Sequence, residues 1–133
     1  MKGKESIKTI DDIIKTFYDE FGSITNKFVI ITLKLDEAKN LKEKYLSHPG
    51  VYVWYNFKKG PIKVGRHLIN ARRRALEHIR DNTAGIMKAI CEDKDTILIL
   101  FNVKDQKDIH WVAALEIFLE KSINPLIKSN RLG

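Results

Sequence analysis

The stretch that decides the fold is GVYVWYNFKKGPIKVGR, residues 50–66. Residues 50–55 favour a strand, because residues 51–55 are all β-branched or aromatic, and residues 62–66 favour a second strand. The segment between them contains Asn56, Gly60 and Pro61, which are typical of a turn. Two short strands joined by such a turn predict a β-hairpin.

Helices and further strands are predicted on both sides of this hairpin. Apolar residues at three- and four-residue spacing indicate helices, whereas short β-branched or continuous apolar runs indicate strands. The expected elements are a helix over 7–21, a strand over 28–33, a helix over 37–46, helices over 71–81 and 86–90, a strand over 96–103 and a helix over 109–123. This mixture favours an α+β fold with a small, mainly antiparallel sheet flanked by helices.

Local signals predict where helices end and how the chain divides. Gly22 is expected to end the first helix, and Asp36, Asn70 and Asp108 are expected to cap later ones. The sequence Ser-His-Pro-Gly at 47–50 breaks the pattern. We therefore expect residues 1–46 to form a helix–strand–helix extension that packs on the core, and residues 47–133 to form the main domain. The strand of the extension could join the sheet as an edge strand.

Composition limits the class of protein and its location. With 133 residues, 44% of them hydrophobic, the chain is long enough for one core and too short for two. No apolar run approaches the roughly 18 residues of a membrane span, and the polar start lacks the apolar stretch of a secretory signal. The single cysteine, Cys91, excludes an internal disulfide and a cysteine-based zinc cluster. These features predict a cytoplasmic protein with no membrane partner.

Positive charge is concentrated in one part of the sequence. The chain carries a formal net charge of +7, and residues 57–80 hold eight cations, with Glu77 as their one acid. The remaining residues therefore contribute no net charge. A concentrated cationic surface attracts polyanions, of which nucleic acid is the commonest. Charge alone leaves a solvated basic helix face as the alternative.

Chemically distinctive residues follow one another in a recognisable order. Ten residues separate two short motifs, Gly50-Val51-Tyr52 and Lys63-Val64-Gly65. The next expected helix carries Arg74 and His78. The last expected helix carries Glu116, nine residues before Pro125. This ordered set resembles the paired signature and the later motifs of the GIY-YIG nuclease family, over about residues 48–130. Residues before this region show no such resemblance.

The resemblance implies a divalent-metal-dependent endonuclease that hydrolyses phosphodiester bonds of DNA. Tyr52 would orient or activate the attacking water, Arg74 would bind the phosphate, and Glu116 would ligate one Mg²⁺ or Mn²⁺ ion. His78, one helical turn from Arg74, would share proton transfer or a phosphate contact. The residue types suit these roles, because a guanidinium matches phosphate oxygens and a carboxylate with water ligands holds Mg²⁺. Helix position alone favours a different role for Glu116, an ion pair with a lysine or arginine.

Three positions depart from the family pattern, and one of them is the bracing asparagine, whose usual place holds Lys128, so that Asn130, in preference to Asn124, would substitute for it. Lys63 replaces the tyrosine of the second motif. It can act as a base only if its pKa is depressed. Otherwise it holds a phosphate, or the replacement means that catalytic activity has been lost. The usual spacing would select Arg73 as the phosphate ligand, but Arg74 brings His78 into register.

Further contacts with nucleic acid are expected from polar residues near the motifs. These residues are Lys58, Lys59, Arg66, Arg72, Arg73 and Arg80, and Asn130, which would replace a bracing asparagine of the family.

Two other functions fit the same residues. The chain could be a catalytically inactive nucleic-acid-binding module on the same fold, with Lys63 marking lost chemistry. It could instead be a structural or protein-binding domain whose basic face meets an acidic partner. RNA stays open as a substrate, and so does a homodimer, because a single-site nuclease that cuts both strands often works as a dimer.

Overall fold

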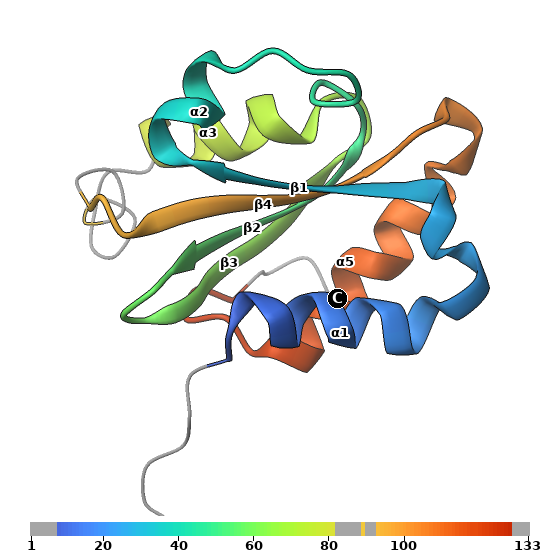
Figure 1. The fold of residues 1–133 in the computed structure, drawn as a ribbon, viewed down its shortest axis with the longest axis horizontal. Helices are drawn as coiled ribbons and strands as arrows, with labels where there is room; N and C mark the ends of the chain where they lie inside the picture. Colours follow the sequence, from blue (N-terminus) through green and yellow to red (C-terminus); the bar gives the residue numbers. More distant parts are fainter. Residues whose placement is uncertain (1–7, 82–88, 90–92, 129–133) are drawn as a thin grey trace, which may run out of the picture.

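The computed structural model describes residues 8–81, 89 and 93–128 of the chain. A four-stranded antiparallel sheet forms the centre, with helices on both faces, so the predicted α+β fold is confirmed (Figure 1). The strands are β1 (Phe28–Lys34), β2 (Gly50–Asn56), β3 (Gly60–His67) and β4 (Thr96–Val103), in the spatial order β1-β4-β2-β3. The helices are α1 (Ile10–Phe21), α2 (Leu35–Asn40), α3 (Ala71–Asp81) and α5 (His110–Ile123), with 3₁₀ turns over Gly22–Lys27 and Gln106–Asp108.

The predicted hairpin is confirmed and forms one side of the sheet. β2 pairs antiparallel with β3 and, along its other side, with β4. Asn56 organises the turn, because its Oδ1 accepts from the backbone N–H groups of Lys58 and Lys59 at 2.8 and 3.1 Å. Its Nδ2 donates to Asp93 Oδ2 at 2.9 Å and to Thr96 Oγ1 at 3.1 Å, which ties the turn to the start of β4.

Each face of the sheet has its own apolar core. Alternate residues of β2 point to opposite faces, as strand geometry requires. Val51 and Val53 pack with α1 and α5, whereas Tyr52 and Trp54 pack with α2 and α3. Figure 1 shows the same arrangement, with α2 and α3 on one side of the sheet and α1 and α5 on the other. Trp54 Nε1 donates to the carbonyl of Ala75 at 3.2 Å, which fixes α3 over the hairpin.

The N-terminal part of the chain supplies the edge strand β1. β1 pairs with β4 along its full length, from Phe28 opposite Val103 to Lys34 opposite Ile97. α1, which precedes β1, begins at Ile10 and so later than the expected start at residue 7, because a capping box between Thr9 and Asp12 sets its first turn. Gly22 ends it, as expected. Residues 28–34 therefore belong to the same sheet as the hairpin.

Three further local expectations are wrong, two because of tertiary contacts and one because of a local hydrogen bond. The helix expected over 37–46 ends at Asn40, where the carbonyl of Leu41 accepts from Arg72 Nη1 at 2.6 Å instead of continuing the helix. Asp36 does not cap this helix, since the Glu37 side chain bonds the N–H of Lys34. Asp108 does not cap α5 either, because it lies in the preceding 3₁₀ turn, 3.8 Å from Lys27 Nζ.

The remaining helix expectations have mixed outcomes. Asn70 caps α3 as expected, since its Oδ1 accepts from the N–H of Arg73 at 3.0 Å. The helix expected over 86–90 falls outside the described residues. Within the described part of the chain, no helix is both long enough and apolar enough to cross a membrane.

The close approach of β2 to β4 predicts that Gly50→Ala destabilises the fold. A Cβ at Gly50 would lie 2.1 Å from Asn102 Oδ1 and 2.5 Å from the carbonyl oxygen of Phe101. We expect the substitution to lower the free energy of unfolding by about 2–4 kcal/mol, measured by urea denaturation. The exposed Ser47→Ala, as a control, should change it by less than about 0.5 kcal/mol. Equal stability of the two variants would contradict the packing described here.

Candidate active site

β3 is the outer strand of the sheet, and the described C-terminal segment covers only part of it. The N–H groups of Leu126 and Ile127 donate to the carbonyls of Pro61 and Ile62 at 3.2 and 2.8 Å, and Ile127 forms a parallel bridge with Lys63. In the described chain this pairing stops at Lys63. We call the remaining part of the strand, residues 64–67, the β3 edge.

The Tyr52 side chain reaches from β2 towards the β3 edge. Tyr52 lies opposite Gly65, and a Cβ at Gly65 would be 2.3 Å from both Cζ and the hydroxyl oxygen of the ring. The hydroxyl end of the phenol therefore lies directly over Gly65, on the face covered by α3. Only glycine leaves room for the ring at this position. The glycine of the second motif is thus explained by packing.

Lys63 lies on the same face of the sheet as Tyr52. It is the cross-strand partner of Trp54, two residues beyond Tyr52 on β2, and residues i and i+2 of a strand share a face. Lys63 is buried, with 8% of its surface exposed. The structure therefore brings together the two motif positions, Tyr52 and Lys63, as diagonal neighbours.

The three consecutive arginines of α3 lie on different sides of that helix. Ala71 and Ala75 are fully buried against the sheet. Because successive helical residues are about 100° apart, Arg72 and Arg74 occupy the two flanks and Arg73 points away from the sheet. Arg73 Nε and Arg74 Nη1 each lie 3.7 Å from a carboxylate oxygen of Glu77, and both side chains are exposed.

The flank that carries Arg74 faces the β3 edge. Arg72 lies on the other flank, since it bonds the carbonyl of Leu41 just after α2. α2 contacts β1 and β4, whereas α3 contacts mainly β2 and β3. The flank of Arg74 is therefore the outer one. Of the two candidate phosphate ligands, Arg74 is better placed than Arg73.

Glu116 approaches the β3 edge from the opposite face. It lies on α5 with 3% of its surface exposed, and its Oε1 accepts from Arg66 Nη1 at 2.5 Å. Arg66 is the residue after Gly65 and is opposite Val51, so its side chain points to the α5 face. Tyr52 and Glu116 thus lie on either side of two consecutive residues of β3. The expected site residues gather at one edge from both faces of the sheet, not on a single face.

A second buried carboxylate lies beside Glu116 and was missed in the sequence. Glu120 is one helical turn further along α5, with 5% of its surface exposed. The signal that could have revealed it is the four-residue spacing from Glu116.

The donor set fits a hard divalent cation. Mg²⁺ is commonly held by one or two carboxylates together with several water molecules. Glu116 and Glu120 could supply the carboxylates. Among the described residues, no group of three or more histidine, cysteine, aspartate or glutamate side chains is arranged so that it could hold a metal ion. Binding of an ion at Glu116 would require this carboxylate to share or release Arg66.

The hairpin separates the cations that are adjacent in the sequence. Lys58 and Lys59 lie in the turn, whereas Arg66 lies near the other end of β3. Seven or eight residues of strand place it about 25 Å away. Lys58 Nζ is 3.2 Å from Asp95 Oδ2, and this carboxylate raises the pKa of Lys58. The basic stretch is therefore not one continuous patch, and of its described arginines Arg66 and Arg74 lie towards the β3 edge.

Three predicted site residues are only partly covered by the structure. His78 and Arg80 belong to α3, but their side chains are outside the described part. Asn130 lies outside the described residues.

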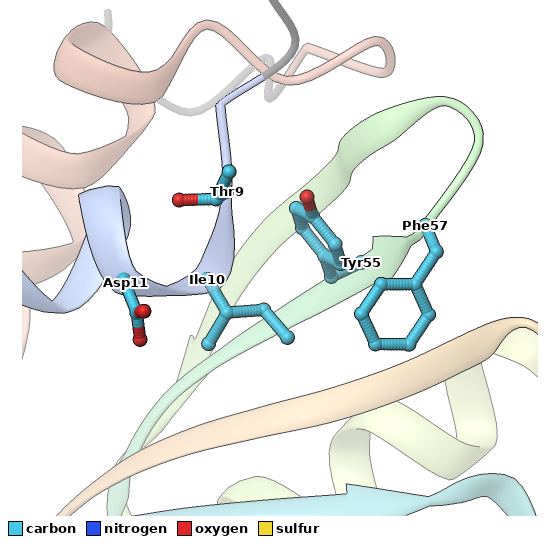
Figure 2. Close-up of a pocket in the computed structure, with 5 residues that line it drawn as sticks. All are labelled: Thr9, Ile10, Asp11, Tyr55 and Phe57. Carbon is cyan, nitrogen blue, oxygen red and sulfur yellow. The ribbon is translucent and has the colours of Figure 1, made fainter.

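A surface depression elsewhere contains none of the predicted site residues. It has a volume of about 450 Å³ and is lined by Thr9, Ile10, Asp11, Tyr55 and Phe57. Figure 2 shows the Tyr55 ring between Ile10 of α1 and Phe57 of the hairpin turn. The Tyr55 hydroxyl donates to the carbonyl of Lys8 at 2.7 Å, and burial together with the nearby Asp12 raises its pKa. The depression lies at the turn end of the hairpin and takes no part in the candidate site.

A scan against protein-family models found none that matches the chain, and searches of curated proteins and of solved structures found no match either.

The ion pair at the β3 edge predicts energetic coupling between Arg66 and Glu116. Arg66→Met should lower the free energy of unfolding by about 1–3 kcal/mol, because it leaves a buried carboxylate without this guanidinium. Arg66→Met combined with Glu116→Gln should recover at least about 1 kcal/mol of that loss, since the charge is then gone. Urea denaturation of the four proteins measures this coupling. Strictly additive effects would contradict it.

Proposed function

We propose that the chain is a divalent-metal-dependent endonuclease that hydrolyses phosphodiester bonds of DNA. The observation that carries the proposal is the gathering of a phenol, a buried carboxylate and an outward guanidinium at the β3 edge. Tyr52, Glu116 and Arg74 come from three elements that are far apart in the sequence. A folding domain gains little from such an arrangement, because burial of a carboxylate is costly.

Arginines at this edge are suited to hold the phosphate. A guanidinium presents two parallel N–H donors that match two phosphate oxygens. Arg74 is exposed on the outer flank of α3 and contacts Glu77 only at 3.7 Å, which a phosphate can replace at low cost. Arg66 borders the same position from the α5 face.

Tyr52 and Lys63 are suited to move the proton of the attacking water. In hydrolysis, the water oxygen forms a bond to phosphorus while the ester P–O bond breaks, the water loses a proton and the leaving oxygen gains one. A tyrosine accepts that proton only as phenolate, a form that a neighbouring ammonium group favours. Lys63 shares the face of Tyr52 and can provide this charge.

The metal ion would be held by Glu116, with Glu120 next to it on α5. A bound Mg²⁺ or Mn²⁺ ion stabilises negative charge on the phosphate and on the leaving oxygen. The protein's own contribution is to hold the carboxylate rigidly at the β3 edge, since Glu116 is buried on α5 and fixed by Arg66.

A non-catalytic nucleic-acid-binding module is the second candidate. Two observations favour it: Arg66 already neutralises Glu116, and lysine stands at the position of the second tyrosine. Both candidates require nucleic acid at the same edge. The proposal also includes DNA rather than RNA as the substrate, a homodimer as the form that cuts both strands, and a cytoplasmic location.

Cleavage of a supercoiled plasmid distinguishes the two candidates. With Mg²⁺ or Mn²⁺, the wild-type protein should convert the plasmid to nicked and linear forms, and EDTA should prevent this. Glu116→Gln should lower the rate at least about 100-fold, because the metal ligand is lost. Glu20→Gln, a matched change of an exposed carboxylate on α1, should have no effect. Binding without cleavage by the wild-type protein would support the non-catalytic module instead, and equal cleavage by both variants would exclude Glu116 as the ligand.

The salt dependence of DNA binding tests the role of Arg74. Each phosphate contact that is lost should lower the slope of log K against log salt by about one. We expect this decrease for Arg74→Gln and no change for Lys15→Gln on α1, measured by fluorescence anisotropy with a labelled duplex in EDTA. An unchanged slope for Arg74→Gln would remove Arg74 from the phosphate site.

A further inference from the structure

We infer that the loop between β3 and α3 is an apolar wedge that enters a groove of duplex DNA, an inference that rests on the proposed function. Leu68 and Ile69 form the tip of this loop, with 41% and 65% of their surfaces exposed. Two large aliphatic side chains in solvent at adjacent positions have no part in either core. They directly follow the β3 edge in the chain, so they are placed to contact a substrate bound there.

The loop is held in place by hydrogen bonds, so the exposure is a fixed feature of the fold. His67 Nδ1 accepts from the N–H groups of Ile69 and Asn70 at 3.2 and 3.1 Å. Asn70 in turn caps α3, and the N–H of Ala71 donates to the carbonyl of His48 at 3.2 Å. A preorganised loop binds a partner with a smaller loss of conformational entropy.

Cations on both sides of the loop point to a polyanion as its partner. Arg66 precedes the tip, while Arg73 and Arg74 follow it with exposed side chains. Arg73 and Arg74 occupy the first turn of α3, where the helix dipole disfavours positive charge and where acidic residues are absent. Their position therefore costs stability, which binding of an anion would offset.

An apolar tip between cations matches duplex DNA better than an acidic protein surface. Proteins that bend DNA commonly insert leucine or isoleucine between base pairs, while adjacent basic residues hold the flanking phosphates. In that arrangement Ile69 would separate two stacked base pairs. The arginines would bind the phosphates of the strand and so hold it against the β3 edge. The wedge would select sites that are easily unstacked, such as pyrimidine–purine steps or mismatches.

Binding to a duplex that contains 2-aminopurine, in EDTA to prevent cleavage, tests the wedge. Fluorescence of 2-aminopurine rises when the base is unstacked, and anisotropy of a labelled duplex gives the affinity. Ile69→Ala, alone or with Leu68→Ala, should weaken binding about tenfold and abolish most of the fluorescence rise. The slope of log K against log salt should not change, because an aliphatic side chain displaces no counterions. Ile117→Ala, an equally large exposed residue on α5, should alter neither quantity.

Each contrary outcome has a distinct meaning. If the wild-type protein binds the duplex but the loop variants bind equally well, the wedge is wrong and the proposed DNA-binding function stands. If the wild-type protein binds no duplex and binds polyglutamate instead, both inferences fail. Thermal melting should show the loop variants folded as stably as the wild-type protein, because their altered side chains are exposed.

Discussion

The antiparallel register of β2 with β3 is the constraint on which the rest of the site depends. This register sets Tyr52 opposite Gly65 and Val51 opposite Arg66, so consecutive residues of β3 face opposite sides of the sheet. A slip by one residue would exchange the two faces and place the Tyr52 ring against a side chain. The asparagine-centred turn holds this register at one end of the hairpin, and the close approach of Gly50 to Asn102 holds β2 against β4.

Burial of Glu116 gives the edge its chemical character. A carboxylate on the core side of α5 is stable only with charged or polar partners, and Arg66 is one of them. The same ion pair allows two interpretations, since it holds the carboxylate ready for a metal ion but also neutralises it. A phosphate that competes for Arg66 would free part of the carboxylate at the moment the substrate binds. Substrate and metal would then bind cooperatively, without any change in the backbone.

Much of the fold follows from local sequence patterns, whereas the site depends on long-range register. The continuous apolar run of β4, the turn after Asn56 and the cap at Asn70 are local signals, and the structure confirms them. The length of α2 was not predictable, because the carbonyl of Leu41 is bonded by an arginine 31 residues later. The partner of Glu116 likewise depends on how α5 crosses β3, and local patterns predict only that this partner is a lysine or an arginine. The roles of Tyr52, Lys63 and His78 stay predictions.

Anomalous scattering from crystals soaked in Mn²⁺ tests the central claim most directly. The account predicts one ion on the Glu116 carboxylate at the β3 edge, at about 2.1 Å, with water as its other main ligand. An unchanged Arg66–Glu116 pair without an ion, or a manganese peak confined to distant carboxylates such as Asp93 and Asp95, would contradict it.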